Sequence, residues 1–333
     1  MRVLTVAYPF AAMGPDAVGG AEQVASALDF ALVAAGHESV VVADARSVVA
    51  GRLHPVPSVS GDIDACARAN QHARVREAIA AEPDVNLIHM HGIDFFDYVP
   101  DAGPPVLATL HLPPDWYPGA VWRGRAWLNT VSDAQHRACP PSERWVGTIA
   151  NGVPVAALGA LHARRSFALM LGRICPEKGQ HLALQAAHAA DVALLLAGVT
   201  YPYPDHQAYL RDHVRPLLDR RRRLIGPVGF ARKRRLVSAA RCVLIPSLAA
   251  ETSSLVAMEA AACGTPVIAF RAGALRETVR DGVTGFVVDD VAGMSRVLRD
   301  LASIDPEACR REARARFDVR RMTAEYLALY ARL

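Results

Sequence analysis

The sequence predicts an α/β protein built from two doubly wound, Rossmann-like domains. Short apolar runs alternate with longer segments of helical periodicity along the chain, which is typical of parallel sheets covered by helices. The chain has 333 residues, more than a single hydrophobic core usually serves. The alternation begins twice, near Val3 and near Phe167. We therefore expect one domain over residues 1–155 and a second over residues 156–317, joined by a linker near 154–165.

The first series of elements fills the N-terminal half of the chain. The helix that follows Gly19 and Gly20 carries apolar residues at helical spacing from Val24 to Ala35. The predicted helices of this half cover residues 21–35 and 62–81. The predicted strands are 3–7, 39–43, 85–89, 106–110, 127–131 and 145–150.

The second series repeats the pattern. Its predicted strands are 167–171, 192–198, 224–228, 242–245, 267–270 and 286–288. Helices are expected over 180–190, up to about 218, over 232–240, and from about 306 to 333. A further helix is expected to start just after the loop that contains Glu251, with Glu259 about two turns inside it. The loops after these strands lie at carboxyl ends, where doubly wound sheets bind their ligands.

The most informative segment runs from Pro246 to Pro266 and contains Glu251 and Glu259. The apolar runs on either side predict strand, loop, helix, turn and strand. Eight residues of helix span about 12 Å, whereas a glycoside hydrolase holds its two carboxylates about 5–9.5 Å apart. The two glutamates are better placed to hold the ends of an extended polar ligand, with a diphosphate at the helix start between them.

Charge is distributed unevenly along the chain. Residues 1–155 carry a net charge of −6 and residues 156–333 a net charge of +10, so the second half suits an anionic ligand. The arginine runs at 220–223 and 232–235 lack the interleaved aromatics of a single-strand binder, and we expect no nucleic-acid partner. Because the chain has 35 arginines and only 2 lysines, Lys178 is conspicuous.

Cysteine usage and hydropathy bear on the compartment. The six cysteines are scattered without a Cys-x-x-Cys pair, which favours reduced thiols. No apolar run approaches the ~20 residues of a membrane helix, and the first ten residues do not have the pattern of a signal peptide. We expect a cytoplasmic protein with no transmembrane segment. Peripheral contact with a membrane and the oligomeric state remain open.

Four motifs together resemble the family-4 retaining glycosyltransferases (glycosyl transferase group 1), which have the GT-B fold. They are the Glu-x7-Glu pair at 251 and 259, GRICPEKG at 172–179, ANGVP at 150–154 and GGAEQV at 19–24. The resemblance implies two Rossmann-like domains facing a central cleft. The C-terminal domain would bind a nucleotide sugar and the N-terminal domain an acceptor, with the last helix, about 318–333, crossing back to the first domain.

The resemblance also implies roles for single residues. Glu251 would contact hydroxyls of the donor sugar and Glu259 the ribose. Arg173 and Lys178 would stabilise the diphosphate leaving group as its negative charge develops, in place of a metal ion.

Further family contacts fall on loops and on one strand end. His111 ends an apolar strand and would contact the transferring sugar. The backbone amides at Gly19 and Gly20 would approach the donor. Many family members have Phe-Gly at the start of the two-glutamate helix, where this chain has hydroxyl residues that would bind phosphate: Thr252, Ser253 and Ser254.

Two groups of side chains have two interpretations each. Trp116 and Tyr117 either stack on the acceptor or pack a long loop against the domain. His89 and His91 point the same way from one strand and, with His111, could mimic a metal site. No carboxylate or fourth ligand supports that site, so we expect no metal.

We therefore expect a metal-independent, retaining glycosyltransferase that moves a sugar from a nucleoside-diphosphate sugar to a hydroxyl acceptor and needs no cofactor. Retention rests on the resemblance alone. One alternative is a nucleotide-sugar epimerase or phosphorylase-like enzyme on the same fold. Another is a catalytically silent subunit that binds a nucleotide sugar. The sequence does not identify the sugar, the base or the acceptor, although a small acceptor is slightly favoured.

Overall fold

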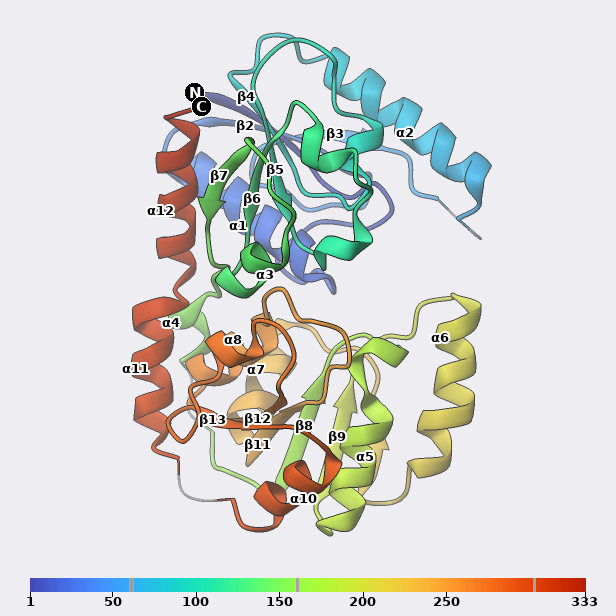
Figure 1. Cartoon of the computed structure of the whole chain (residues 1–333), viewed down its shortest axis with the longest axis vertical. Helices are drawn as coiled ribbons and strands as arrows, with labels where there is room; N and C mark the ends of the chain where they lie inside the picture. Colours follow the sequence, from blue (N-terminus) through green and yellow to red (C-terminus); the bar gives the residue numbers. More distant parts are fainter. Residues whose placement is uncertain (60, 62, 160–161, 302–303) are drawn as a thin grey trace. The chain divides into compact units, whose positions relative to one another are not determined.

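The computed structural model describes residues 1–59, 61, 63–159, 162–301 and 304–333. The chain divides into two compact units (Figure 1). Unit 1 comprises Met1–Asn151 and Arg320–Leu333, and unit 2 comprises Gly152–Val319. Two segments of the chain, near residue 151 and near residue 320, therefore lead from one unit to the other.

Unit 1 is built on a parallel sheet whose seven strands, in the described part of the chain, have the order β3-β2-β1-β4-β5-β6-β7. The strands are β1 (Arg2–Val6), β2 (Glu38–Asp44), β3 (Arg52–Val56), β4 (Leu87–Met90), β5 (Val106–Leu110), β6 (Trp127–Thr130) and β7 (Trp145–Thr148). The helices are α1 (Gly20–Ala34), α2 (Ala65–Ala80), α3 (Asp133–Ala138) and α12 (Val319–Tyr330), with short 3₁₀ turns at Phe95–Asp97, Pro114–Trp116 and Val121–Arg123.

Strand β3 was missed by the sequence prediction. It reads Arg-Leu-His-Pro-Val, without an apolar run or strict alternation. Pro55 has no N–H to donate to a neighbouring strand, and a central strand must form hydrogen bonds with a neighbour on each side. In the described part of the chain this strand pairs with β2 alone, so it lies at the sheet edge, where proline is tolerated. The predicted helix start at Asp62 lies outside the described residues, and α2 begins at Ala65 with Asp64 as its cap.

Unit 2 has a second parallel sheet, with the order β10-β9-β8-β11-β12-β13 in the described part. The strands are β8 (Phe167–Leu171), β9 (Ala193–Ala197), β10 (Arg222–Leu224), β11 (Cys242–Ile245), β12 (Val267–Phe270) and β13 (Gly285–Val288). The helices are α4 (Val155–Leu158), α5 (Gln180–Ala189), α6 (Pro204–Tyr209), α7 (Phe230–Ala239), α8 (Leu255–Ala262), α9 (Leu275–Thr278), α10 (Val291–Arg299) and α11 (Pro306–Arg316).

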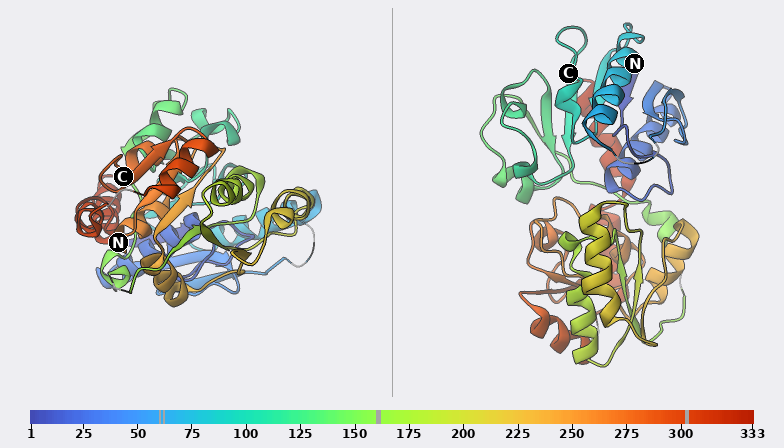
Figure 2. Two further views of the ribbon diagram at one scale, coloured as in Figure 1. Left: turned by 90° about the horizontal axis from the view of Figure 1, so that it is seen from below. Right: turned by 90° about the vertical axis from the view of Figure 1, so that its right-hand side faces the viewer.

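Apolar cores lie on both faces of the second sheet, as a doubly wound fold requires. Helices α7, α8 and α11 contribute to one core, and α5 and α10 to the other; Figure 2 shows the helices of this unit from two further sides. After α6 the chain continues through a π-helical turn (Leu210–Val214) and a 3₁₀ turn (Arg215–Leu217), and Figure 1 draws these as one rod.

The predicted linker at 154–165 contains the short helix α4, and residues 160–161 within it lie outside the described residues. The strand predicted at 224–228 instead covers Arg222–Leu224. This strand contains two arginines, so a search for apolar runs did not detect its true bounds. Among the described residues, no helix combines the length and apolar character needed to cross a membrane.

Glycines allow two strand-end loops of unit 2 to meet. Gly172 follows β8 with φ +144°, and Gly198 follows β9. A Cβ atom on Gly198 would lie 1.8 Å from the carbonyl oxygen of Gly172. Any side chain at Gly198 would push the two loops apart at the carboxyl edge of the sheet.

Candidate active site

Two loops at the carboxyl edge of the second sheet are held together by their backbones. The first, residues 172–179, follows β8, and the second, residues 246–254, follows β11. The amide of Leu248 donates to the carbonyl oxygen of Glu177 at 2.8 Å. Gly179 has φ +70°, and a Cβ atom there would lie 2.3 Å from the carbonyl oxygen of Pro246. The loops that carry Lys178 and Glu251 are therefore in direct contact.

Lys178 and Glu251, predicted separately from the sequence, lie in one site. The Nζ of Lys178 donates to Oε1 of Glu251 at 2.6 Å, and Oγ of Ser247 donates to the same oxygen at 2.5 Å. The Glu251 side chain is 11% exposed and that of Lys178 is 31% exposed. The site thus presents an oriented carboxylate and a partly exposed cation to an incoming polar ligand.

The backbone of Glu251 is fixed by the segment that follows β12. The amide of Ala274 donates to the carbonyl oxygen of Glu251 at 2.7 Å. Gly273 has φ +53°, and a Cβ atom there would lie 2.3 Å from that same oxygen. Glycine at position 273 therefore lets the two segments approach closely enough to hold Glu251 in place.

Arg173 leaves the same loop as Lys178. Its guanidinium lies over the Tyr201 ring, 5.7 Å from the ring centre, in a cation–π arrangement. Its carbonyl oxygen accepts from Nε2 of Gln180 at 2.6 Å. Both predicted cations of the diphosphate site are therefore anchored at the carboxyl end of β8.

The helix after Glu251 is shorter than the sequence prediction assumed. Helix α8 begins at Leu255, and Ser254 is its cap, with Oγ accepting from the amide of Ala257 at 3.3 Å. Since Glu251 lies three residues before the cap, the eight helical steps assumed in the 12 Å estimate are not present. Thr252 is buried. Among the described residues, the Ser253 hydroxyl is one of the buried polar groups without a hydrogen-bond partner.

Glu259 forms a second lysine–glutamate pair. Its side chain is 4% exposed, that of Lys233 on α7 is 17% exposed, and Lys233 donates to Oε1 of Glu259. Burial raises the pKa of Glu259, while the charge of Lys233 opposes that shift. Sequence analysis missed Lys233, although the scarcity that singled out Lys178 applies equally to it. The two lysines of the chain pair with the two motif glutamates.

In unit 1, the half-buried His111 lies beside the buried His89 and His91. Nδ1 of His91 and Nε2 of His111 share a hydrogen bond of 2.9 Å. His89 contacts the Tyr330 hydroxyl of α12 at 2.6 Å and the Thr109 hydroxyl at 2.7 Å. Burial lowers the pKa of His111 to about 4 and those of His89 and His91 well below their ordinary value. All three imidazoles are therefore neutral at pH 7.

The two aromatic residues after His111 have different environments. Tyr117 is 6% exposed, and its hydroxyl oxygen accepts from the amides of His111 and Leu112 at 3.2 and 3.4 Å. The packing interpretation accounts for this side chain, which holds the backbone at His111. Trp116 is 42% exposed, and its role as an acceptor contact stays a prediction.

The carboxylate of Glu22, in the first turn of α1, lies against the glycine loop before that helix. Gly19 caps the helix, which begins at Gly20, and Glu22 is buried. A Cβ atom on Gly19 would lie 1.8 Å from Oε2 of Glu22, so glycine makes room for this carboxylate at the helix start. The contact of Gly19 and Gly20 with a donor stays a prediction.

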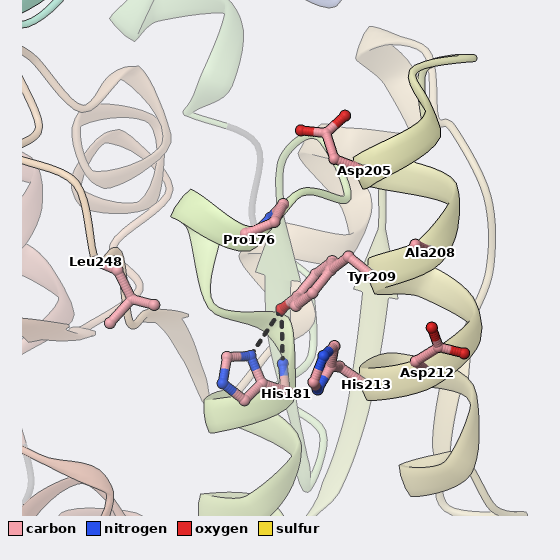
Figure 3. A pocket seen from close by; sticks show the side chains of 8 residues that line it. All are labelled: Pro176, His181, Asp205, Ala208, Tyr209, Asp212, His213 and Leu248. Atoms are coloured by element: carbon pink, nitrogen blue, oxygen red, sulfur yellow. Dashed lines mark hydrogen bonds between the residues drawn. The ribbon is translucent and has the colours of Figure 1, made fainter.

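A hollow of about 380 Å³ opens beside the 172–179 loop. Figure 3 shows its lining, with Tyr209 directed at His181 and the acidic side chains of Asp205 and Asp212 on the neighbouring helical rod. Its lining residues are Pro176, His181, Asp205, Ala208, Tyr209, Asp212, His213 and Leu248.

Comparison with protein families matches both halves of the chain. Residues 18–153 match the family model Glycosyltransferase Family 4, and residues 165–303 match Glycosyl transferases group 1. The D-inositol 3-phosphate glycosyltransferase of Mycobacterium sp. (strain KMS) is 38% identical over 165 residues. That match covers 47% of this chain and only 37% of the relative's length.

Several solved structures cover this chain completely, including these two. Sucrose-phosphate synthase from Thermosynechococcus elongatus has a TM-score of 0.83 at 19% identity, over 99% of its own chain. Anabaena HepE in complex with UDP and glucose has a TM-score of 0.77 at 19% identity, over 100% of its own chain. With two parallel sheets of this GT-B architecture and both halves matched by glycosyltransferase families, the chain belongs to the glycosyltransferases of family 4 and group 1.

Proposed function

We propose that the protein transfers a sugar from a nucleoside-diphosphate sugar to a hydroxyl group, with the donor bound at the carboxyl edge of the unit 2 sheet. The observation that carries this proposal is the direct pairing of Lys178 with Glu251 on two loops at that edge. Doubly wound sheets bind ligands at this edge. The acceptor is assigned to unit 1, with Trp116 as a candidate contact.

The leaving group needs positive charge where its bond breaks. In the proposed reaction, the bond from the anomeric carbon to the diphosphate oxygen breaks as the acceptor oxygen forms its bond on the same face. The acceptor's proton passes to the leaving phosphate, and the sugar keeps its configuration. Arg173 and Lys178 stabilise the developing diphosphate charge without a divalent ion. When the donor binds, Lys178 exchanges part of its interaction with Glu251 for a phosphate oxygen.

The two glutamates act on different parts of the donor. Glu251, held by Ser247 and by the Ala274 amide, accepts hydrogen bonds from sugar hydroxyls. Glu259 accepts from ribose hydroxyls, and the charge of Lys233 favours its ionised form against the effect of burial, which raises its pKa. Because HepE was crystallised with UDP and glucose, UDP-glucose is the first donor to test here, followed by GDP- and ADP-sugars.

The test compares Lys178→Ala with a matched cation variant, Arg299→Ala, at an exposed position of α10. Loss of a preorganised donor to developing charge costs about 10²–10³-fold in turnover. We expect that loss for Lys178→Ala at saturating donor and no change for Arg299→Ala. Parent-like turnover of Lys178→Ala would refute the assignment. A nucleotide sugar that changes without any acceptor would instead indicate an epimerase.

A further inference from the structure

A cluster of three potential metal ligands joins the loop that carries the two cations to helix α6. It consists of Cys175 and Glu177 from the 172–179 loop and His206 from α6, and their ligand atoms all lie within 4.8 Å of one another. Cys175 is fully buried and His206 is 6% exposed. No sequence spacing signals this group, because about thirty residues and a strand separate Glu177 from His206.

Two atoms of the cluster are unsatisfied. Within the part of the chain that the structure describes, Oε2 of Glu177 and Nδ1 of His206 are buried and have no hydrogen-bond partner. A buried polar group without a partner costs about 1–3 kcal/mol. Both atoms lie beside the buried Cys175 thiol, whose recorded contact is a long one of 3.7 Å to the carbonyl oxygen of Arg173, so a further group that binds among them would satisfy both.

The ligand types select the group that would fit. A thiolate, an imidazole and a carboxylate are the ligands that Zn²⁺ takes in proteins, at about 2.0–2.3 Å. In such a tetrahedron the ligand atoms are about 3.3–3.8 Å apart, so the longest separation in the cluster, up to 4.8 Å, must contract by about 1–1.5 Å. Three protein ligands leave the fourth position for water.

We propose that Cys175, Glu177 and His206 bind one Zn²⁺ ion, which fastens α6 to the 172–179 loop. The Cys175 thiol releases its proton to solvent on binding, and its sulfur takes the metal in that proton's place.

The position of this site gives the ion a structural role. Glu177 uses its backbone carbonyl to hold Leu248, three residues before Glu251, and its chain neighbour is Lys178. The lining of the hollow in Figure 3 includes two chain neighbours of the ligands: Pro176, between Cys175 and Glu177, and Asp205, next to His206. The ion orders the loops of the proposed donor site and takes no part in the bond changes.

The test uses the untagged full chain, stripped with a chelator and titrated with Co²⁺ as a spectroscopic probe for Zn²⁺. We expect one Co²⁺ per chain, a thiolate-to-cobalt charge-transfer band, and displacement of that band by Zn²⁺. At a hundredfold excess over its dissociation constant, Zn²⁺ should raise the melting temperature by about 5–10 °C for a unit of this size.

Variants locate the ion. Cys175→Ser should abolish the charge-transfer band, and His206→Gln should weaken binding by at least about 10–100-fold, since even outer-shell changes have that effect. Cys66→Ser, at an exposed thiol of unit 1, is the matched control and should bind like the parent. Circular dichroism of the metal-free variants confirms that they fold.

Three results would overturn the proposal: a parent protein that binds no Co²⁺, a band that persists in Cys175→Ser, or a band that Cys66→Ser removes. Should Cys175→Ser fail to fold, Glu177→Gln and His206→Gln carry the same test. None of these measurements involves a nucleotide sugar. The metal site can therefore be refuted while the proposed glycosyl transfer holds. The glycosyl transfer can likewise be refuted while the metal site holds.

Discussion

Mild acid should destabilise unit 1 through its neutral histidine cluster. The pKa of His111 is about 4 in the folded chain against an ordinary value of 6.5. Between these two values the unfolded chain binds more protons than the folded one. Stability contributed by the neutral imidazole is therefore present above pH 6.5 and is lost as the pH falls towards 4.

The magnitude follows from the size of the shift. One pKa unit corresponds to 1.36 kcal/mol, so His111 alone should lower the free energy of unfolding by about 2 kcal/mol between pH 7 and pH 5. His89 and His91 act in the same direction, because burial lowers their pKa as well. Asp44 and Glu82 also have lowered pKa values, but their losses fall mainly below pH 5.

The assay can observe this unit by itself. All four tryptophans, at positions 116, 122, 127 and 145, belong to unit 1, so their fluorescence during urea denaturation reports on that unit. We expect His111→Gln to lose about 2 kcal/mol less than the parent on going from pH 7 to pH 5. His37 is partly exposed, and His37→Asn serves as the control. It should lose as much free energy of unfolding as the parent. Equal losses for His111→Gln and the parent would refute the reasoning.

Three further predictions concern unit 2. Glu251→Gln should lower turnover strongly while affinity for the free nucleoside diphosphate stays nearly intact, whereas Glu259→Gln should mainly raise the Michaelis constant; calorimetric titration showing the reverse would exchange the two roles. Lys233→Met leaves a buried carboxylate without its partner and should lower the stability of unit 2 by about 3–5 kcal/mol. Circular dichroism during unfolding measures this loss. The double variant with Glu259→Leu should recover most of that loss, and an unaffected single variant would show that the pair contributes little. In chelator-treated protein, adding Mg²⁺ or Mn²⁺ should not raise the transfer rate, and a strong stimulation would contradict a leaving group stabilised by arginine and lysine alone.

The sequence was sufficient to predict the strands that are buried on both faces of a sheet. Strand β5 has the predicted bounds, 106–110, because Val-Leu-Ala-Thr-Leu is buried throughout. Strand β10 was misplaced because its arginines are tolerated in a short edge strand, with Arg222 paired to Asp219. Apolar patterning detects central strands of a parallel sheet far better than edge strands.

The residues of the candidate site were also predictable only in part. The scarcity of lysine and the resemblance to family motifs singled out Lys178 and Glu251, and both lie on loops next to recognisable strands. The partner of Glu259 could not be predicted from spacing, because Lys233 reaches it from α7, 26 residues earlier. The meeting of Cys175 with His206 likewise depends on how α6 packs against the sheet. Contacts made by tertiary packing leave no periodic signal in the sequence.

The place of α12 in unit 1 has a consequence for synthesis on the ribosome. The hydroxyls of Tyr326 and Tyr330 complete the hydrogen bonds of His89 and Asn129 in the core of unit 1, yet these tyrosines are translated after the whole of unit 2. A nascent chain can therefore finish unit 2 while the earlier unit still has buried polar groups without partners. The unit translated first is completed last, and during that interval it depends most on protection from aggregation.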